Sequence, residues 1–478
     1  MRRRYLSLAM SMLFATAFSA VAADNSSPQA LIAKGEYLAI AADCGACHTP
    51  PKEGAAMSGG YGIQSPLGTV FASNITPSKV AGIGNYTEQD FARAVRDGIN
   101  QQGQYLYPAM PYTSYSRITD ADIHALYAYF MHGVAAVDRP APQTHLPFPF
   151  NIRSSMALWN TLFSNNKPFI AEKSASQEIN RGNYLVNALA HCDTCHTPRD
   201  ALMGQEDSKA LSGGSLGSWY APNITPDKTS GIGGWSSDNL AQYLKTGHVA
   251  GKAQAAGPMA EAVEHSLQHL SDADINAIVS YLQQLPAIKN TAIKNTAMNS
   301  GESKSRDSYG AASNTEQLMR GDVATADPGW KIYSGSCANC HQANGEGTFY
   351  YPSLFHNSAT GADDPSNLVS AIVNGVQRNV NGQQIDMPAF GPDANFTVRL
   401  TDRQIADVSN YVLKTYGNPK ASVTAAQVKE IREGGPKPLL AKLTAPSVMI
   451  GAVVVVVLIL ALILLWASKR RKKHVARK

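Results

Sequence analysis

All six cysteines of the 478-residue chain lie in three copies of one pattern, Cys-X-X-Cys-His. The copies are Cys44-Gly45-Ala46-Cys47-His48, Cys192-Asp193-Thr194-Cys195-His196 and Cys337-Ala338-Asn339-Cys340-His341. Two thiols at this spacing could form a redox-active dithiol, contribute to a zinc site, or make thioether bonds to the two vinyl groups of a c-type haem. The adjacent histidine favours the third chemistry, because its imidazole can reach the iron from one face. Three copies with no cysteine left over argue against ordinary disulfide pairing.

We therefore predict three covalently bound haem c groups. Their thioether bonds would use Cys44 and Cys47, Cys192 and Cys195, and Cys337 and Cys340. The first axial ligands of the three irons would be His48, His196 and His341. No residue is predicted to be catalytic, because no nucleophile and base accompany these motifs.

A haem that only transfers electrons needs a second axial ligand, and methionine is the one that raises its reduction potential. Met110 and Met259 follow the first cysteine of their motifs at nearly the same distance, and Met387 is the only methionine between Met319 and Met449. We predict that these three methionines complete the iron coordination, each from an extended loop favoured by a neighbouring proline. The rival ligands are histidines, namely His124, His132, His145, His248, His265, His269 and His356.

The segments around the motifs repeat along the chain. Asn74-Ile75-Thr76-Pro77 matches Asn223-Ile224-Thr225-Pro226, and Gly82-Ile83-Gly84 matches Gly231-Ile232-Gly233, whereas the third copy diverges. Each copy ends in a predicted amphipathic helix that starts at a capping residue, Thr119, Ser271 or Thr401. Two similar haem units and one different unit are therefore expected.

The predicted fold class is mainly α, with three cytochrome-c-like domains in tandem plus one C-terminal transmembrane helix. The expected boundaries are a signal peptide at 1–22, the first domain at 23–150, the second at 176–288, a linker at 289–325, the third domain at 326–419, the transmembrane helix at 446–468 and a basic tail at 469–478.

The two ends of the chain predict its location. Three arginines, an apolar run and a small-residue cleavage pattern at residues 1–22 are typical of export. The uncharged run at 448–467 is long enough to span a bilayer, and the basic residues after it indicate a cytoplasmic tail. Without these ends the body is mildly acidic, so no nucleic-acid partner is expected. The sequence thus predicts a body on the periplasmic side of the inner membrane, anchored by its C-terminal helix.

With these motifs, the Tyr107-Pro108-Ala109-Met110-Pro111 loop and the Asp386-Met387-Pro388 loop, the chain resembles the tri-haem cytochrome c subunits of bacterial membrane-bound dehydrogenases. Those complexes oxidise alcohol, gluconate, sorbitol, fructose or glucose. The resemblance implies a non-catalytic subunit of an oxidoreductase complex acting on CH-OH donors. It also implies a separate flavin- or quinone-dependent partner subunit, which feeds electrons to these haems for delivery to ubiquinone or another respiratory acceptor.

Two alternatives of different classes stay open at this point. The chain could be a multi-haem enzyme of the peroxidase or thiosulfate-oxidising type, in which one haem has an open or unusual axial position. It could also be the cytochrome subunit of a terminal oxidase. A methionine candidate in every unit favours electron relay over both.

Overall fold

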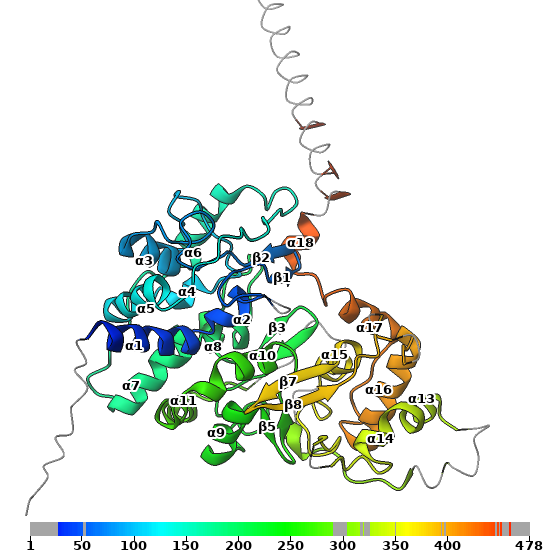
Figure 1. Cartoon of the computed structure of the whole chain (residues 1–478). Coiled ribbons are helices and arrows are strands. Elements are labelled where there is room, and N and C mark those ends of the chain that lie inside the picture. The colour runs from blue at the N-terminus through cyan, green and yellow to red at the C-terminus, as the bar shows by residue number, and fades with distance from the viewer. Residues whose placement is uncertain are drawn as a thin grey trace, which may run out of the picture.

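The computed structural model describes residues 27–451, 458 and 459, except 51–53, 290–303, 316–318, 320–325, 349, 393, 396, 397, 445, 446 and 449. Helices dominate this part of the chain, and its sheets are short antiparallel hairpins of two strands each. Three units follow one another along the chain and pack together, as Figure 1 shows. The predicted signal peptide at 1–22 and basic tail at 469–478 lie outside the described residues.

The first unit begins and ends with helices that pack against each other. Its elements are α1 (Pro28–Ala41), α2 (Cys44–His48), β1 (Gly62–Ser65), β2 (Gly68–Phe71), α3 (Glu88–Asp97), α4 (Tyr112–Tyr115) and α5 (Asp120–His132). A connection to the second unit contains the 3-10 turn η1 (Arg153–Ser155) and α6 (Met156–Phe163).

The second unit repeats this plan, with its first helix continuing into a π-helical turn. Its elements are α7 (Gln177–Tyr184), η2 (Leu185–Leu189), α8 (Cys192–His196), η3 (Asp207–Lys209), β3 (Gly214–Leu216), β4 (Trp219–Ala221), α9 (Ser237–Thr246), β5 (His248–Val249), β6 (Ala253–Gln254), α10 (Pro258–His265), η4 (Leu267–His269) and α11 (Asp272–Gln284). The first helix of the unit, α7, packs against the last, α11.

The third unit has the same order of first helix, motif and last helix but a longer hairpin between them. Its elements are η5 (Arg306–Ser308), α13 (Pro328–Ile332), the π-helical η6 (Tyr333–Cys337), α14 (Ala338–His341), α15 (Ser366–Asn374), β7 (Val376–Val380), β8 (Gln383–Met387) and α16 (Asp402–Tyr416), followed by α17 (Ala425–Arg432) and α18 (Leu439–Leu443). In the β7–β8 hairpin, Val376 lies opposite Met387 and Arg378 opposite Ile385.

A glycine makes the close crossing of first and last helix possible in every unit. A Cβ atom built on Gly35, Gly182 or Gly329 would lie 2.0, 2.0 or 2.2 Å from a backbone carbonyl oxygen of the opposite helix, in Ala125, Ala277 and Asp407 respectively. Any other side chain would force the two helices apart, because real Cβ atoms do not approach so closely.

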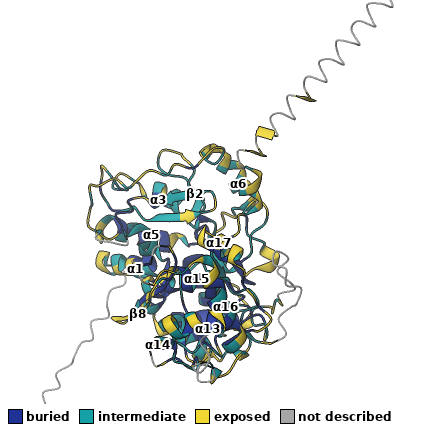
Figure 2. Ribbon diagram, turned by 90° about the vertical axis from the view of Figure 1, so that its right-hand side faces the viewer, coloured by how far each residue is buried: buried dark blue, intermediate teal, exposed yellow. Residues whose placement is uncertain are grey.

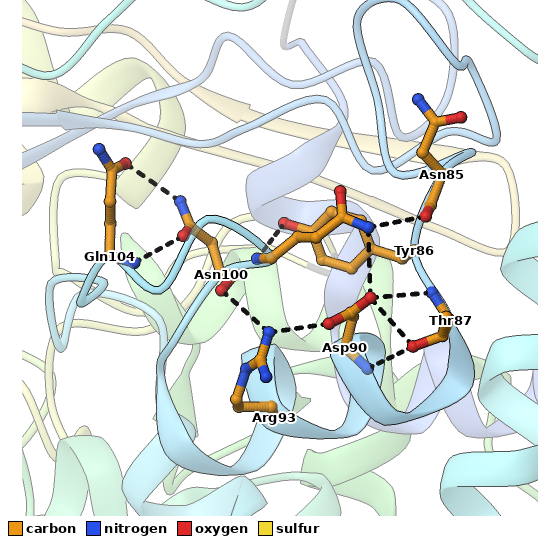
Figure 3. Close-up of polar contacts among 8 residues, drawn as sticks. Asn85, Tyr86, Thr87, Asp90, Arg93, Asn100 and Gln104 are labelled. Carbon is orange, nitrogen blue, oxygen red and sulfur yellow. Dashed lines mark hydrogen bonds and ion pairs between the residues drawn. The ribbon is translucent and has the colours of Figure 1, made fainter.

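Side-chain caps fix where the helices begin. The predicted caps are confirmed, since the hydroxyl groups of Thr119, Ser271 and Thr401 each accept a hydrogen bond from the backbone N–H three residues later. Figure 3 shows the same device at α3, where Thr87 and Asp90 cap each other and the Asp90 carboxylate also contacts Arg93. These caps are local, which is why the sequence pattern identified three of them.

Among the described residues, the buried hydrophobic side chains form two clusters instead of one per unit. The buried residues are the dark-blue parts of the ribbon in Figure 2. The first cluster joins the first and second units, with Leu126 and Leu189 as typical members, and also takes in Val380 of the third unit. The second cluster belongs to the third unit and includes Leu413. The first two units therefore share one core.

The structure corrects the predicted fold class at its C-terminal end. Among the described residues, no helix combines the length and the apolar character needed to cross a membrane. The last helix described in full, α18, has five residues and would cover only about 8 Å at 1.5 Å per residue, against a hydrocarbon core of about 30 Å. Most of the segment predicted to span, 446–468, lies outside the described residues. The C-terminal transmembrane helix is therefore not supported.

Candidate functional site

In the first two units the Cys-X-X-Cys-His motif forms a short helix, α2 or α8, whereas in the third Cys337 ends η6 and the rest of the motif forms α14. In the first two units a residue with left-handed backbone, Asp43 (φ 53°) or His191 (φ 39°), makes the turn into the motif helix. In the third unit the π-helical η6 runs straight into α14 instead. The two cysteines of a motif thus lie about one turn apart on the same short helix in the first two units, which suits two bonds to one flat ring.

The motif histidines are held in one orientation by backbone carbonyl groups. The ring Nδ1 lies 2.7 Å from the Ser73 oxygen in His48, 2.6 Å from the Pro222 oxygen in His196 and 2.9 Å from the Pro352 oxygen in His341. An Nδ1–H that donates to a carbonyl fixes the tautomer and leaves Nε2 as the nitrogen that can bind a metal. This arrangement fits the axial ligand of a haem iron.

The protonation state of these histidines agrees with that role. Burial lowers the pKa of His48, His196 and His341 below the ordinary value, in His196 to about 4, although the carbonyl hydrogen bond of each opposes the shift. The imidazoles are therefore neutral at physiological pH, and the neutral ring is the form that ligates iron.

The cysteines do not have the character of a redox dithiol. Burial raises the pKa of the Cys44, Cys47, Cys192 and Cys337 thiols to about 12 and that of Cys195 to about 11. A reactive dithiol needs a stabilised thiolate and hence a lowered pKa. Among the described residues, no group of three or more His, Cys, Asp or Glu side chains is placed to hold a metal ion.

The three methionines predicted as ligands lie in three different local structures. Met110 is in the loop before α4, Met259 is in the first turn of α10, and Met387 is the last residue of β8. Each is partly buried against the same core cluster as the first cysteine of its motif. The expectation of an extended loop is wrong for Met259, because Pro258 takes the first helical position, where a missing N–H costs nothing. Iron ligation by all three stays a prediction.

The rival histidines lie mostly at the surface. His124, His132, His145, His265, His269 and His356 are exposed, and His124 contacts Glu88. His248, on β5, is the one rival that is partly buried. This distribution favours the methionines.

The first two units exchange contacts across their haem motifs, which the tandem order did not predict. Ser114, four residues after Met110, donates a 2.9 Å hydrogen bond to Asp193 of the second motif. In return, α10, which carries Met259, packs against the first motif helix α2. The pKa of the Cys47 thiol is raised chiefly by burial, then by nearby carboxylates, and Cys195 of the second motif also contributes. The two attachment segments therefore lie close together.

Two tyrosines make the exchange reciprocal. Tyr37 of the first unit donates a 2.7 Å hydrogen bond to Asp274 in α11, and Tyr184 of the second donates a 2.7 Å hydrogen bond to Asp122 in α5. Tyr37 and Tyr184 precede their motifs at equivalent positions, in the matching runs Gly-Glu-Tyr-Leu and Gly-Asn-Tyr-Leu. Such repeated positions are the one sequence signal that could have revealed this interface.

Short helices presenting Cys-X-X-Cys-His between crossed first and last helices define a c-type cytochrome. The cytochrome c family profile matches the chain three times, over residues 32–133, 179–286 and 326–415, so the chain belongs to the cytochrome c family. Covalently bound haem c and electron transfer are accordingly properties of this protein.

Comparison with individual proteins places the chain in a narrower group within this family. The chain is 48% identical over 422 residues to the fructose dehydrogenase cytochrome subunit of Gluconobacter japonicus, covering 88% of this chain and 86% of the relative. It is 38% identical to the gluconate 2-dehydrogenase cytochrome c subunit of Pantoea cypripedii (89% and 94% covered) and 36% identical to the alcohol dehydrogenase (quinone) cytochrome c subunit of Gluconacetobacter polyoxogenes (87% and 87%). The protein belongs with the cytochrome subunits of bacterial dehydrogenase complexes.

Proposed function

We propose that the chain carries three haem c groups, one in each unit, and relays electrons from a periplasmic flavo- or quinoprotein dehydrogenase subunit to ubiquinone or another respiratory acceptor at the membrane. The proposed domains are 23–150, 176–288 and 326–419, joined by a linker at 289–325. The proposed covalent attachment uses all six cysteines, and the proposed axial pairs are His48 with Met110, His196 with Met259 and His341 with Met387.

The observation that carries this proposal is the repeated histidine geometry. The motif imidazoles of three separate units each have Nδ1 within hydrogen-bond distance of a carbonyl oxygen. One such histidine could be a packing residue, but three that each follow a Cys-X-X-Cys pair indicate three equivalent sites. The relatives support the dehydrogenase partner, because the three cited are all cytochrome subunits of dehydrogenases.

The bound haems would supply the one-electron carriers, and the chain supplies their environment. It orients one imidazole per site and places each site against an apolar cluster. It also packs the first two motifs close together, so that electrons need not cross solvent between them. Apolar surroundings and a sulfur ligand both favour the reduced state of a haem.

Haem counting and co-purification test the proposal. Pyridine haemochrome analysis of the solubilised protein should find three haems per chain, and His48→Ala, His196→Ala and His341→Ala should each change the spectrum of one haem only. A flavin- or quinone-containing subunit should co-purify with the chain. That subunit should oxidise a CH-OH substrate and pass the electrons to these haems. Fewer than three haems, or peroxide turnover by the isolated chain, would contradict this function.

A further inference from the structure

The β3–β4 hairpin of the second unit contacts the motif helix and orients the proposed histidine ligand. Its strand β3 packs against α8, and a Cβ atom on Gly214 would lie 2.8 Å from the Cys195 carbonyl oxygen. Directly after β4, the carbonyl oxygen of Pro222 lies 2.6 Å from Nδ1 of His196. The hairpin therefore fixes the histidine side of this site.

The same hairpin also contacts the segment that carries Met259. Trp219 is the first residue of β4, and its indole ring lies against Gly257. A Cβ atom on that glycine would be 2.4 Å from Cε2 of the ring and 2.7 Å from Cδ2 and Cζ2. The ring is thus in van der Waals contact with the backbone two residues before Met259.

A stiff turn connects the indole contact to the methionine. Gly257 is the N-cap of α10 with φ 51° and ψ −136°, a conformation that favours glycine. Its carbonyl oxygen accepts the N–H groups of Ala260 and Glu261, which ties it to the helix. Pro258 follows with its ring-restricted φ, and Met259 is the second helical residue. A displacement of Gly257 therefore moves Met259 as well.

The first unit supports its methionine segment in a different way. Val70 corresponds to Trp219, because each lies four residues before the asparagine of the Asn-Ile-Thr-Pro segment. In the first unit, Tyr107 donates a 2.8 Å hydrogen bond to the Phe150 carbonyl oxygen, and the Arg153 guanidinium lies 4.7 Å from the centre of the Tyr107 ring. The indole is thus a feature of the second unit that the repeat itself does not require.

The third unit holds the outer edge of β4. The side-chain amide of Asn367, on α15, accepts the Tyr220 N–H at 2.9 Å and donates to the Tyr220 carbonyl oxygen at 2.8 Å. Ser370, on the same helix, donates its hydroxyl to the Ser218 carbonyl oxygen. The asparagine amide thus pairs with β4 as a further strand would. The position of Trp219 therefore depends on the third unit as well.

We propose that Trp219 is the positioning residue for Met259 at the iron of the second haem. This inference rests on the proposed ligation of that iron by His196 and Met259. A ligand group that is held in its bound conformation binds more tightly, because it loses less freedom on binding. Methionine ligation raises the reduction potential of a haem. The indole therefore strengthens the sulfur–iron bond and keeps the potential of the second haem high.

Spectroscopy of the full protein with its haems tests this inference. A ferric haem with a methionine ligand has a weak charge-transfer absorption at the red end of the visible spectrum, and another ligand in place of the sulfur abolishes it. Trp219→Ala should weaken this band by the share of one haem and lower one of the three midpoint potentials. Trp219→Phe keeps an aromatic ring and should retain most of both.

Imidazole binding measures how firmly the methionine is held, because imidazole competes with the sulfur for ferric iron. In Trp219→Ala one haem should bind imidazole about 3- to 10-fold more tightly, the effect of losing one aromatic contact. Trp235→Ala is the matched control, since it removes an indole of the same unit whose ring contacts Tyr243 and Lys252. This control should leave the band, the potentials and the imidazole affinity unchanged.

Asn367→Ala provides a second variant that leaves the indole in place. It frees the outer edge of β4 and should raise the imidazole affinity of the same haem by a smaller factor. Where Trp219→Ala does not fold, an unchanged imidazole affinity in Asn367→Ala overturns the positioning role.

Met259→Ala separates this inference from the proposed function. If Met259→Ala loses the band of one haem while Trp219→Ala behaves like the wild type, the positioning role is overturned and the ligand assignment stands. Equal changes in Trp219→Ala and Trp235→Ala also overturn the positioning role. An unchanged band in Met259→Ala refutes the proposed ligand itself.

Discussion

At the scale of single residues, one hydrogen bond per unit decides how each motif histidine points. The histidines were recognisable from the sequence because Cys-X-X-Cys-His is contiguous. Their carbonyl partners, in Ser73, Pro222 and Pro352, were not, because backbone carbonyls leave no signature in residue type. The hydrogen bond from Arg378 to the Ala255 carbonyl oxygen was missed for a related reason, since the two residues are 123 positions apart in the chain.

The helix-crossing glycines give a residue-scale prediction. Gly182→Ala would place its Cβ about 2 Å from the Ala277 carbonyl oxygen, so α7 and α11 must separate. We expect a loss of about 1–3 kcal/mol or more in the free energy of unfolding, measured by urea denaturation. Gly234→Ala is the control in the same unit, because its Cβ would meet nothing closer than 3.9 Å. Equal stability of the two variants would contradict the crossing.

Acid stability depends on Asp274, which joins Tyr37 of the first unit to Arg181 of the second. Burial raises its pKa, but the hydrogen bonds from Arg181 and Tyr37 and the charge of Arg181 outweigh burial, so the folded-state pKa lies below 3.8. The ionised carboxylate therefore stabilises the folded protein above about pH 4, and this contribution is lost as the pH falls through the folded-state pKa.

We accordingly expect Asp274→Asn to lower the free energy of unfolding by about 1–3 kcal/mol at pH 6. Between pH 5 and pH 3 this variant should lose less further stability than the wild type. Urea unfolding at a series of pH values measures both effects. Asp272→Asn, on the exposed side of the same helix, is the control and should follow the wild type. If the free energy of unfolding fell equally with pH in the wild type and in Asp274→Asn, the Asp274 carboxylate would not be the group that responds to acid.

At the scale of elements, local rules predicted where the helices begin, but they did not predict the hairpins or the helix that contains Met259. Thr119, Ser271 and Thr401 were identified as caps because a cap involves residues three positions apart. The hairpins escaped prediction because their strands are short and carry no long alternating pattern. The proline beside Met259 predicted an extended loop, but Pro258 takes the first helical position of α10, where proline is compatible with a helix.

The capping box of α3 gives a prediction at this scale. Thr87→Ala removes the hydroxyl that accepts the Asp90 N–H and leaves the Asp90 carboxylate with fewer partners, as Figure 3 allows the reader to follow. We expect a loss of about 1 kcal/mol, seen as a lower urea midpoint. Thr87→Ser keeps the hydroxyl and should retain most of the stability. A midpoint for Thr87→Ala equal to that of Thr87→Ser would contradict the role of the cap.

At the scale of the whole molecule, three tandem repeats do not mean three independent cores. The sequence indicated the order of the units and the likeness of the first two. It gave no sign that their apolar side chains merge into one cluster, because contacts between units depend on surfaces that a linear pattern does not describe. The third unit keeps its own cluster but enters the first one through Val380.

The shared core predicts shared unfolding. Leu189→Ala, in the common cluster, should destabilise the first and second units together by about 2–5 kcal/mol, whereas Leu413→Ala should act mainly on the third. Hydrogen–deuterium exchange followed by mass spectrometry measures each unit separately. Faster exchange confined to the second unit in Leu189→Ala would mean that the first two units open independently.

The reciprocal tyrosine contacts give the first two units an internal pseudo-symmetry. Tyr37 reaches the capping region of the second unit just as Tyr184 reaches that of the first, so the two halves meet through the same patch on each side. A contact of this isologous kind is how two identical subunits form a symmetric dimer. The first two units thus meet with the pseudo-twofold geometry of a homodimer, although both belong to one chain. The third unit contributes Arg378 to the second unit only, through the carbonyl oxygen of Ala255, so this pseudo-symmetry does not extend to the whole molecule.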